Sequence, residues 1–338
     1  MRQIWISKTG GPEVLKIKEG PAPIPRNGEL RIKVEAVGIN PADIMGRMGH
    51  YYKAPAMPYV PGFEVAGTID VVAQGVSGFR EGDKVLAFTR FGGYSDAVCV
   101  PYLQVFKRLD WMSASDGAAL PVDFLTAYVI LIVMGSLHMG NRVLIHNAAS
   151  GVGIAALEIC RMIGTKTYGT AYSDRHEFLR ERGLDFPIDK REQDYEQVIK
   201  ETTAGRGVDI ILNRLDGSDS GKNYRSLAPT GRLIHVEATN IEIGKRGSLW
   251  RRLQSLLTRQ TYAPLSLMHD NKSVAGFNLA NLWDQGDMVQ DWMKQIISWY
   301  DEALFRPVID KTFPFSQVVD AHHYIQNQEY NGKVLLIP

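Results

Sequence analysis

The sequence contains very little cysteine: Cys99 and Cys160 are the only two among 338 residues. Such low usage excludes a small secreted scaffold held together by disulfides. The N-terminal stretch MRQIWISKTG also lacks the apolar core and the small-residue cleavage site of a secretory leader. We therefore expect two reduced thiols in a cytoplasmic protein.

A strong charge of either sign is also missing. The chain has 38 Lys and Arg against 37 Asp and Glu, which gives a formal net charge of +1. No overall electrostatic attraction to nucleic acid or to an anionic membrane follows from this balance. We expect no nucleic acid as a partner.

Long hydrophobic runs are absent as well. The longest one, Phe124 to Met139, is shorter than the about 20 residues that cross a bilayer, and Thr126, Ser136 and His138 interrupt it. It predicts a buried helix and no stable membrane insertion. A basic stretch at 245–259 carries apolar residues at helical spacing, which favours a packed amphipathic helix or a subunit contact over lipid binding.

The chain does contain two kinds of secondary-structure pattern. The first hundred residues or so hold short β-branched runs separated by Gly and Pro, which predict an antiparallel, barrel-like β domain. Between about 120 and 270, strand and helix patterns alternate, which predicts right-handed crossovers and a parallel sheet covered on both faces. A long amphipathic helix at Met288 to Leu304 and a final strand do not continue this alternation. We assign 1–120 and 272–338 to one domain and 121–271 to the other.

The alternating section opens with RVLIHNAASGVGIAALEICRMIG at 142–164, a strand, a turn and a helix. Its fingerprint positions are Ala148, Ser150 and Gly153, with Gly151 beside them, so small residues replace two of the usual three glycines. The turn alone fits a dinucleotide cradle or a purely structural connection. Its position at the first strand of the alternating section favours the cradle, with a pyrophosphate at the helix N-terminus.

The end of the second predicted strand bears on the choice of nucleotide. An NAD site usually has Asp or Glu there, whereas this chain has Thr170. Farther on lie donors and cations able to bind a 2′-phosphate, namely Tyr172, Ser173, Arg175 and Lys190. This set favours NADPH. Asp174 could cap the following helix or repel the phosphate.

Several motifs together resemble one family nearly end to end: GGPEVLKI at 10–17, GINPADIMGRMGHY at 38–51, PGFEVAGTI at 61–69, GDKVLAF at 82–88, AASGVG at 148–153 and GKVLLIP at 332–338. The chain resembles the medium-chain dehydrogenase/reductase superfamily, specifically its zinc-free quinone oxidoreductase (zeta-crystallin-like) branch, and most closely the vesicle amine transport protein subgroup. The resemblance implies an α/β protein with a GroES-like β-rich catalytic domain and a Rossmann domain, a doubly wound parallel sheet. It also implies a cofactor in the cleft and a homodimer.

The resemblance further implies roles for individual residues. Asn40 and Thr126 would flank the nicotinamide, and Gly151, Val152 and Gly153, with Ser150, would hold the pyrophosphate. Arg175 and Lys190 would approach the 2′-phosphate, near Thr170. The backbone around Phe277 and the side chain of Asn331 would hold the carboxamide end of the cofactor.

Zinc is not expected from the donors that are present. Zinc-dependent relatives use a Cys, the His of a Gly-His-Glu motif and a further Cys, with a separate cluster of four cysteines. This chain has Gly62-Phe63-Glu64 at the second element and Pro41 near the first. His322 and His323 are adjacent on a predicted helix and point in different directions, so we expect a surface role for them rather than metal binding.

Without a metal to polarise a carbonyl, the expected substrate is already electron-poor: a quinone or an α,β-unsaturated carbonyl compound that accepts hydride from NADPH. Predicted aromatic residues around the site suggest a small apolar or aromatic acceptor. Tyr51 could donate the proton or stack on the substrate, or Tyr52 could point inward in its place.

Two departures from the family pattern put this redox function in question. After the fourth predicted strand of the alternating section the chain reads Asn213-Arg214-Leu215-Asp216-Gly217, and after the fifth it has Glu237 where a glycine is expected. Glu237 could crowd the dinucleotide, act as a new acid or base, or turn outward. The alternative function is therefore a protein of the same fold with lost or altered redox activity, acting as a non-redox enzyme or as a binding or scaffold protein.

Overall fold

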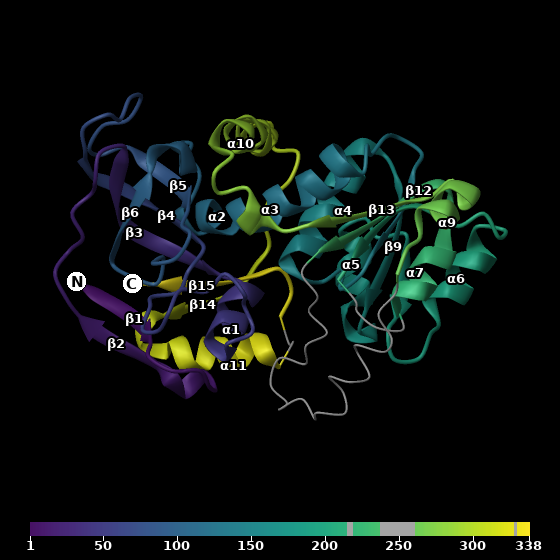
Figure 1. Ribbon diagram of the computed structural model, residues 1–338, viewed down its shortest axis with the longest axis horizontal. Coiled ribbons are helices and arrows are strands. Elements are labelled where there is room, and N and C mark those ends of the chain that lie inside the picture. The colour runs from purple at the N-terminus through teal and green to yellow at the C-terminus, as the bar shows by residue number, and fades with distance from the viewer. Residues whose placement is uncertain (215–218, 237–260, 328–329) are drawn as a thin grey trace. The chain divides into compact units, whose positions relative to one another are not determined.

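The computed structural model describes residues 1–214, 219–236, 261–327 and 330–338 (Figure 1). The chain forms two compact units, one made of Met1–Leu125 with Leu279–Pro338 and the other of Thr126–Asn278. Glu237, the basic stretch at 245–259 and three residues of the Asn213 to Gly217 motif lie outside the described residues.

The first unit is built on a mostly antiparallel seven-stranded sheet, as the β-branched runs predict. Its strand order is β14-β15-β3-β4-β5-β7, and β6 also pairs with β3. Among its described strands, only β14 and β15 run parallel to each other. The strands are β3 (Glu29–Ile39), β4 (Glu64–Val72), β5 (Lys84–Phe88), β6 (Ala97–Pro101), β7 (Val105–Lys107), β14 (Ile309–Pro314) and β15 (Lys333–Ile337).

A two-stranded ribbon and several α-helices are also described in this unit. The long amphipathic helix expected at Met288 to Leu304 is observed two to three residues earlier, as α10. It packs against β7 and the turn at 102–104. The remaining elements are β1 (Arg2–Ile6), β2 (Leu15–Glu19), α1 (Pro41–Met48), α2 (Ala114–Ala119), α10 (Gly286–Asp301) and α11 (Val318–Gln326).

The second unit contains the predicted doubly wound sheet. Its six strands are all parallel, in the order β10-β9-β8-β11-β12-β13. The chain runs outward from β8 to β10 and then returns to the other side of β8, so the topological switch point lies between β8 and β11. The strands are β8 (Arg142–Ile145), β9 (Lys166–Ala171), β10 (Phe186–Asp189), β11 (Val208–Asn213), β12 (Leu227–Val236) and β13 (Ser273–Phe277).

The helices of this unit follow the strands in the expected alternation. Among them α6 and α7 lie side by side (Figure 1). A core of buried apolar residues, including Leu144, Tyr168 and Ile211, fills the centre of the unit. The described helices after β8 are α4 (Gly151–Ile163), α5 (His176–Glu181), α6 (Tyr195–Thr202), α7 (Asp219–Ser226) and α9 (Pro264–Asp270).

The apolar run at Phe124 to Met139 differs from the single buried helix that was expected. Helix α3 (Pro121–Tyr128) changes to a π-helix at Val129–Met134, and Val133 is 44% exposed. The expected helix therefore stops before Ser136, whose φ is positive at 50°. In the described ranges, no helix combines the length and the apolar character needed to cross a bilayer.

Candidate functional site

The turn between β8 and α4 is closed by Ser150 at the helix N-cap. Its Oγ accepts the N–H of Gly153 at 3.2 Å and donates to the carbonyl of Asn147 at 2.8 Å. At Gly153 a Cβ would lie 2.5 Å from the Asn147 carbonyl oxygen and 2.6 Å from that of Ala148. Gly153 is therefore the glycine that close backbone packing requires here, whereas Ser150 fits because its hydroxyl caps the helix.

Thr170 lies at the carboxyl end of β9 and is 3% exposed. Its Oγ1 accepts the N–H of Asn147 at 3.2 Å and is 3.1 Å from His146 Nδ1. The structure thus brings Thr170 to the same turn as Ser150. It also gives the hydroxyl a role inside the fold, where it supports the end of β8.

A buried hydrogen-bond chain continues from His146 across the carboxyl ends of the central strands. Nε2 of His146 is 2.7 Å from Asn223 Oδ1, Asn223 donates to Asn213 Oδ1 at 2.9 Å, and Asn213 Nδ2 is 2.9 Å from His235 Nδ1. A carbonyl oxygen only accepts, so Nε2 carries the proton of His146 and Nδ1 accepts from Thr170. These hydrogen bonds link residues at or near the ends of β8, β11 and β12. They hold the backbone at the start of the turn after β8 in place.

His146 provides a pH-dependence that can be measured. Complete burial lowers its pKa to about 4, from an ordinary value near 6.5. Between these values the unfolded chain binds a proton that the folded protein does not, so stability falls as the pH drops from about 6.5 to 4, by at most about 1.4 kcal/mol per pH unit.

Urea unfolding at a series of pH values, for the wild type and for His146→Gln, checks this. We expect the stability of the wild type to fall relative to the variant over that interval. Parallel profiles of the two proteins would contradict the assignment of this pH-dependence to His146.

A cluster of cations lies just beyond the ends of β9 and β10. The ring of Tyr172 has Lys190 Nζ 3.5 Å and the Arg191 guanidinium carbon 4.3 Å from its centroid. Burial alone would raise the pKa of Tyr172, but hydrogen bonds and charge from Lys190 and Arg191 outweigh it and lower the pKa. Arg175 instead lies 3.4 Å from the carboxylate of Asp174. Arg191 was not singled out from the sequence, although a second cation directly after Lys190 is the signal that indicates it.

In the first unit, Asn40 belongs to a buried polar cluster. Its Nδ2 donates to Glu64 Oε1 at 2.8 Å, and its Oδ1 accepts from Lys333 Nζ at 2.8 Å. The Lys333 ammonium also contacts Glu64 Oε1 at 2.5 Å and Asp123 Oδ2 at 3.2 Å. Because both ends of the amide are held, the orientation of the Asn40 side chain is fixed.

The charge state of this cluster follows from its pairing. Burial alone would lower the pKa of Lys333, but the carboxylates of Asp123 and Glu64 reverse the effect and raise it, so the ammonium stays charged. The second carboxylate oxygen of Glu64 accepts the N–H of Val122 at 2.7 Å. Glu64 thereby links β4 to the start of α3, and neither Lys333 nor Asp123 was singled out from the sequence.

Tyr51 and Tyr52 take opposite environments. Tyr51 is 7% exposed and meets Phe63 edge to face, with ring centroids 5.5 Å apart, whereas Tyr52 is 69% exposed. Phe91 lies 5.1 Å from Phe63, so three aromatic rings form one apolar cluster. Tyr51, and not Tyr52, is therefore the tyrosine packed inside the unit.

Three more of the predicted residues are Thr126, Phe277 and Asn331. Thr126 is buried in α3, Phe277 ends β13, and Asn331 donates its N–H to Asp310 at 3.0 Å. The surface role expected for both adjacent histidines is wrong for His322, which is fully buried and lies 3.2 Å from Tyr94 Oη. The sequence predicted the helix but not that α11 turns His322 into the unit.

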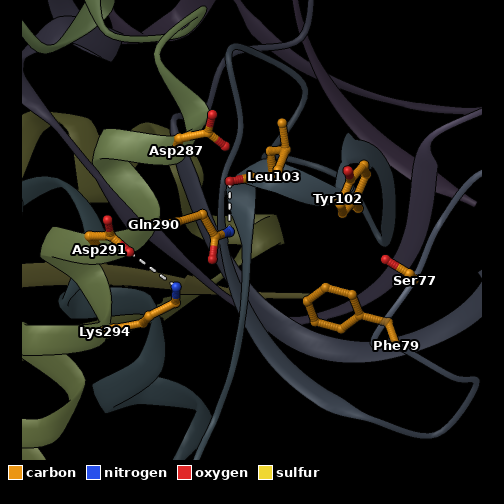
Figure 2. Close-up of a pocket in the computed structure, with 8 residues that line it drawn as sticks. All are labelled: Ser77, Phe79, Tyr102, Leu103, Asp287, Gln290, Asp291 and Lys294. Atoms are coloured by element: carbon orange, nitrogen blue, oxygen red, sulfur yellow. Dashed lines mark hydrogen bonds and ion pairs between the residues drawn. The ribbon is translucent and has the colours of Figure 1, made fainter.

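A pocket of about 330 Å³ lies elsewhere in the first unit, between α10 and the turn at 102–104 (Figure 2). Gln290 donates to the Leu103 carbonyl at 2.8 Å, and Lys294 pairs with Asp291 at 3.1 Å. The other lining residues are Ser77, Phe79, Tyr102 and Asp287. None of the residues singled out from the sequence lines this pocket.

Two parts of the chain match models of known protein families. Residues 26–110 match the alcohol dehydrogenase GroES-like domain, and residues 182–336 match the family described as zinc-binding dehydrogenase. The synaptic vesicle membrane protein VAT-1 homolog of mouse is 36% identical, over 100% of this chain and 84% of that protein. Human quinone oxidoreductase is 31% identical, over 100% of this chain and 98% of that protein. The crystal structure of CurK enoyl reductase has a TM-score of 0.85 at 29% identity, over 99% of this chain and 98% of that one.

The chain is thus an oxidoreductase-family protein with GroES-like and Rossmann domains, as the sequence motifs predict. It belongs to the medium-chain dehydrogenase/reductase superfamily, in the zinc-free branch that contains quinone oxidoreductase and near the VAT-1 homologues.

The matching family is described as zinc-binding, but the side chains described below do not fit a zinc site. Phe63 stands between Gly62 and Glu64, and the carboxylates of Glu64 and Asp123 are held by an ammonium. Within the described parts of the chain, no group of three or more His, Cys, Asp or Glu side chains is arranged to hold a metal ion. Tetrahedral zinc needs at least three such protein ligands.

Proposed function

We propose that this protein is an NADPH-dependent reductase that transfers hydride to a quinone or an α,β-unsaturated carbonyl compound. Membership of the family supports a nicotinamide cofactor, and the printed names of two relatives are those of a quinone oxidoreductase and an enoyl reductase. The observation that carries the choice of NADPH is the cation cluster at the ends of β9 and β10, where Lys190 and Arg191 flank Tyr172. Two cations at this place favour a 2′-phosphate.

In the second unit, the residues that would hold the cofactor are those at the ends of the parallel strands. Gly151, Val152 and Gly153 offer backbone N–H groups to the pyrophosphate. Asn331 Oδ1 is buried and accepts no hydrogen bond from any described residue, which suits an acceptor for the carboxamide of nicotinamide. When bound, the reduced nicotinamide supplies the hydride.

The chain's own contribution is to position the acceptor and to exclude water. Tyr51, Phe63 and Phe91 form a mostly buried aromatic cluster, and its apolar character suits a flat, electron-poor acceptor bound against it. The cluster around Lys333 fixes the side chain of Asn40 at the N-cap of α1. Proximity then accounts for much of the rate, and the proton comes from Tyr51 or from solvent. We also expect a homodimer, which sedimentation analysis of the purified protein measures.

Titration of the purified protein with NADPH and with NADH, followed by nicotinamide fluorescence, tests the proposal. We expect the wild type to bind NADPH saturably. Lys190→Ala should weaken the binding of NADPH by about tenfold and leave the binding of NADH unchanged, because only NADPH carries the 2′-phosphate. Lys200→Ala, an exposed lysine on α6, is the matched control and should bind both as the wild type does. Failure of the wild type to bind either reduced cofactor would remove the proposed function.

A further inference from the structure

We propose that Arg214 binds the pyrophosphate of the dinucleotide and that Ser150 holds the Arg214 side chain in place. Together the two residues compensate for the missing second glycine of the fingerprint. This inference rests on the proposed cofactor. It assigns a function to two positions at which the chain departs from the family pattern. In the fingerprint, the place of Ser150 normally belongs to a glycine.

The fold brings these two positions together at the switch point of the sheet. Arg214 follows the last residue of β11, and Ser150 ends the turn after β8, the strand next to β11. Nη1 of Arg214 donates to Ser150 Oγ at 2.9 Å, and Arg214 is 5% exposed. In open parallel sheets, ligands bind at the carboxyl ends of the strands beside this switch point.

The guanidinium of Arg214 and the N-terminus of α4 both attract anions, because a helix N-terminus carries a partial positive charge. A phosphate group between them would interact favourably with both. The N–H groups of Gly151 and Val152, at the first two positions of α4, have no acceptor inside the helix and add to the same attraction.

The hydroxyl of Ser150 acts through Arg214 rather than on the phosphate. A hydroxyl donates one hydrogen bond and accepts two. Ser150 Oγ donates to Asn147 and accepts from Gly153 and from Arg214, so its capacity is full. A guanidinium carries five N–H donors in a planar fork. Arg214 holds Ser150 with Nη1, and its buried Nε makes no hydrogen bond to any described residue, so donor capacity remains for an anion.

Calorimetric titration of the full-length protein with four probes tests this assignment. ADP-ribose, NADH and NADPH contain the pyrophosphate, and adenosine 2′-monophosphate lacks it. We expect Arg214→Gln to weaken the binding of ADP-ribose, NADH and NADPH by about tenfold each, because one charge-assisted contact to the pyrophosphate is lost. The binding of adenosine 2′-monophosphate should not change. Arg225→Gln is the matched control, since Arg225 forms a surface pair with Glu196 in the same unit, and it should bind all four probes as the wild type does.

A second variant keeps the proposal testable if Arg214→Gln does not fold. Ser150→Gly restores the fingerprint glycine and costs the helix cap little, because glycine is tolerated at the N-cap. If Arg214 binds the pyrophosphate, Ser150→Gly weakens ADP-ribose, because the guanidinium loses its anchor. Unchanged or tighter ADP-ribose binding in either folded variant would overturn the inference, whereas a wild type that binds neither NADPH nor NADH would overturn the proposed function itself.

Discussion

Replacing Lys333 with methionine should lower the free energy of unfolding by about 3–5 kcal/mol, the usual cost of removing one partner of a buried ion pair. Lys333 Nζ contacts Glu64 and Asp123, whose side chains are 0% and 8% exposed. Without the ammonium, two carboxylates lie close together with no cation between them. Asn40 also loses the donor to its Oδ1, so the amide is no longer held from both ends.

Urea unfolding of Lys333→Met at pH 5 and pH 8 checks this prediction and its sign. The uncompensated carboxylates favour protonation in the folded state, which raises their pKa above that of the unfolded chain. Stability of the variant therefore falls as the pH rises, and the loss should be larger at pH 8. Lys294→Met removes only an exposed pair with Asp291 and should cost less than about 1 kcal/mol. A Lys333→Met protein as stable as this control would contradict the account of the cluster.

The same cluster illustrates what the sequence could and could not predict. Asn40 was singled out through the resemblance, and Glu64 drew attention only because Phe63 precedes it. Lys333 opens the apolar strand β15, where a lysine is usually expected to extend to the surface. Its partners come from three distant segments, so no local pattern signals that it is buried.

The fold was predicted because its signals are local. The β-branched runs before residue 101 and the alternation after β8 set the two kinds of sheet, and both are observed. The exceptions depend on tertiary contacts. His322 is buried because α11 turns it toward Tyr94, and Thr170 supports His146 inside the fold. Hydrogen-bond partners of this kind cannot be read from residue spacing.

The turn itself gives the other large expected effect, in Gly153→Ala. Helix propensity alone would make alanine more stable than glycine by about 1 kcal/mol. A Cβ at this position, however, would lie 2.5 and 2.6 Å from two backbone carbonyl oxygens, which cannot rotate away as a flexible side chain does. Overpacking of this kind costs about 1–3 kcal/mol, so the two effects oppose each other and sterics should decide.

We therefore expect Gly153→Ala to be less stable than the wild type by about 2 kcal/mol and to bind ADP-ribose about 100-fold more weakly, because the displaced turn moves the N–H groups of Gly151 and Val152. Gly276→Ala is the control for stability, since a Cβ there meets no atom of the described residues within 4 Å. Urea unfolding and calorimetry measure the two quantities separately. A more stable Gly153→Ala protein would mean that propensity outweighs the contact with the carbonyls. Unchanged ADP-ribose binding would mean that the turn after β8 is only a connection between a strand and a helix.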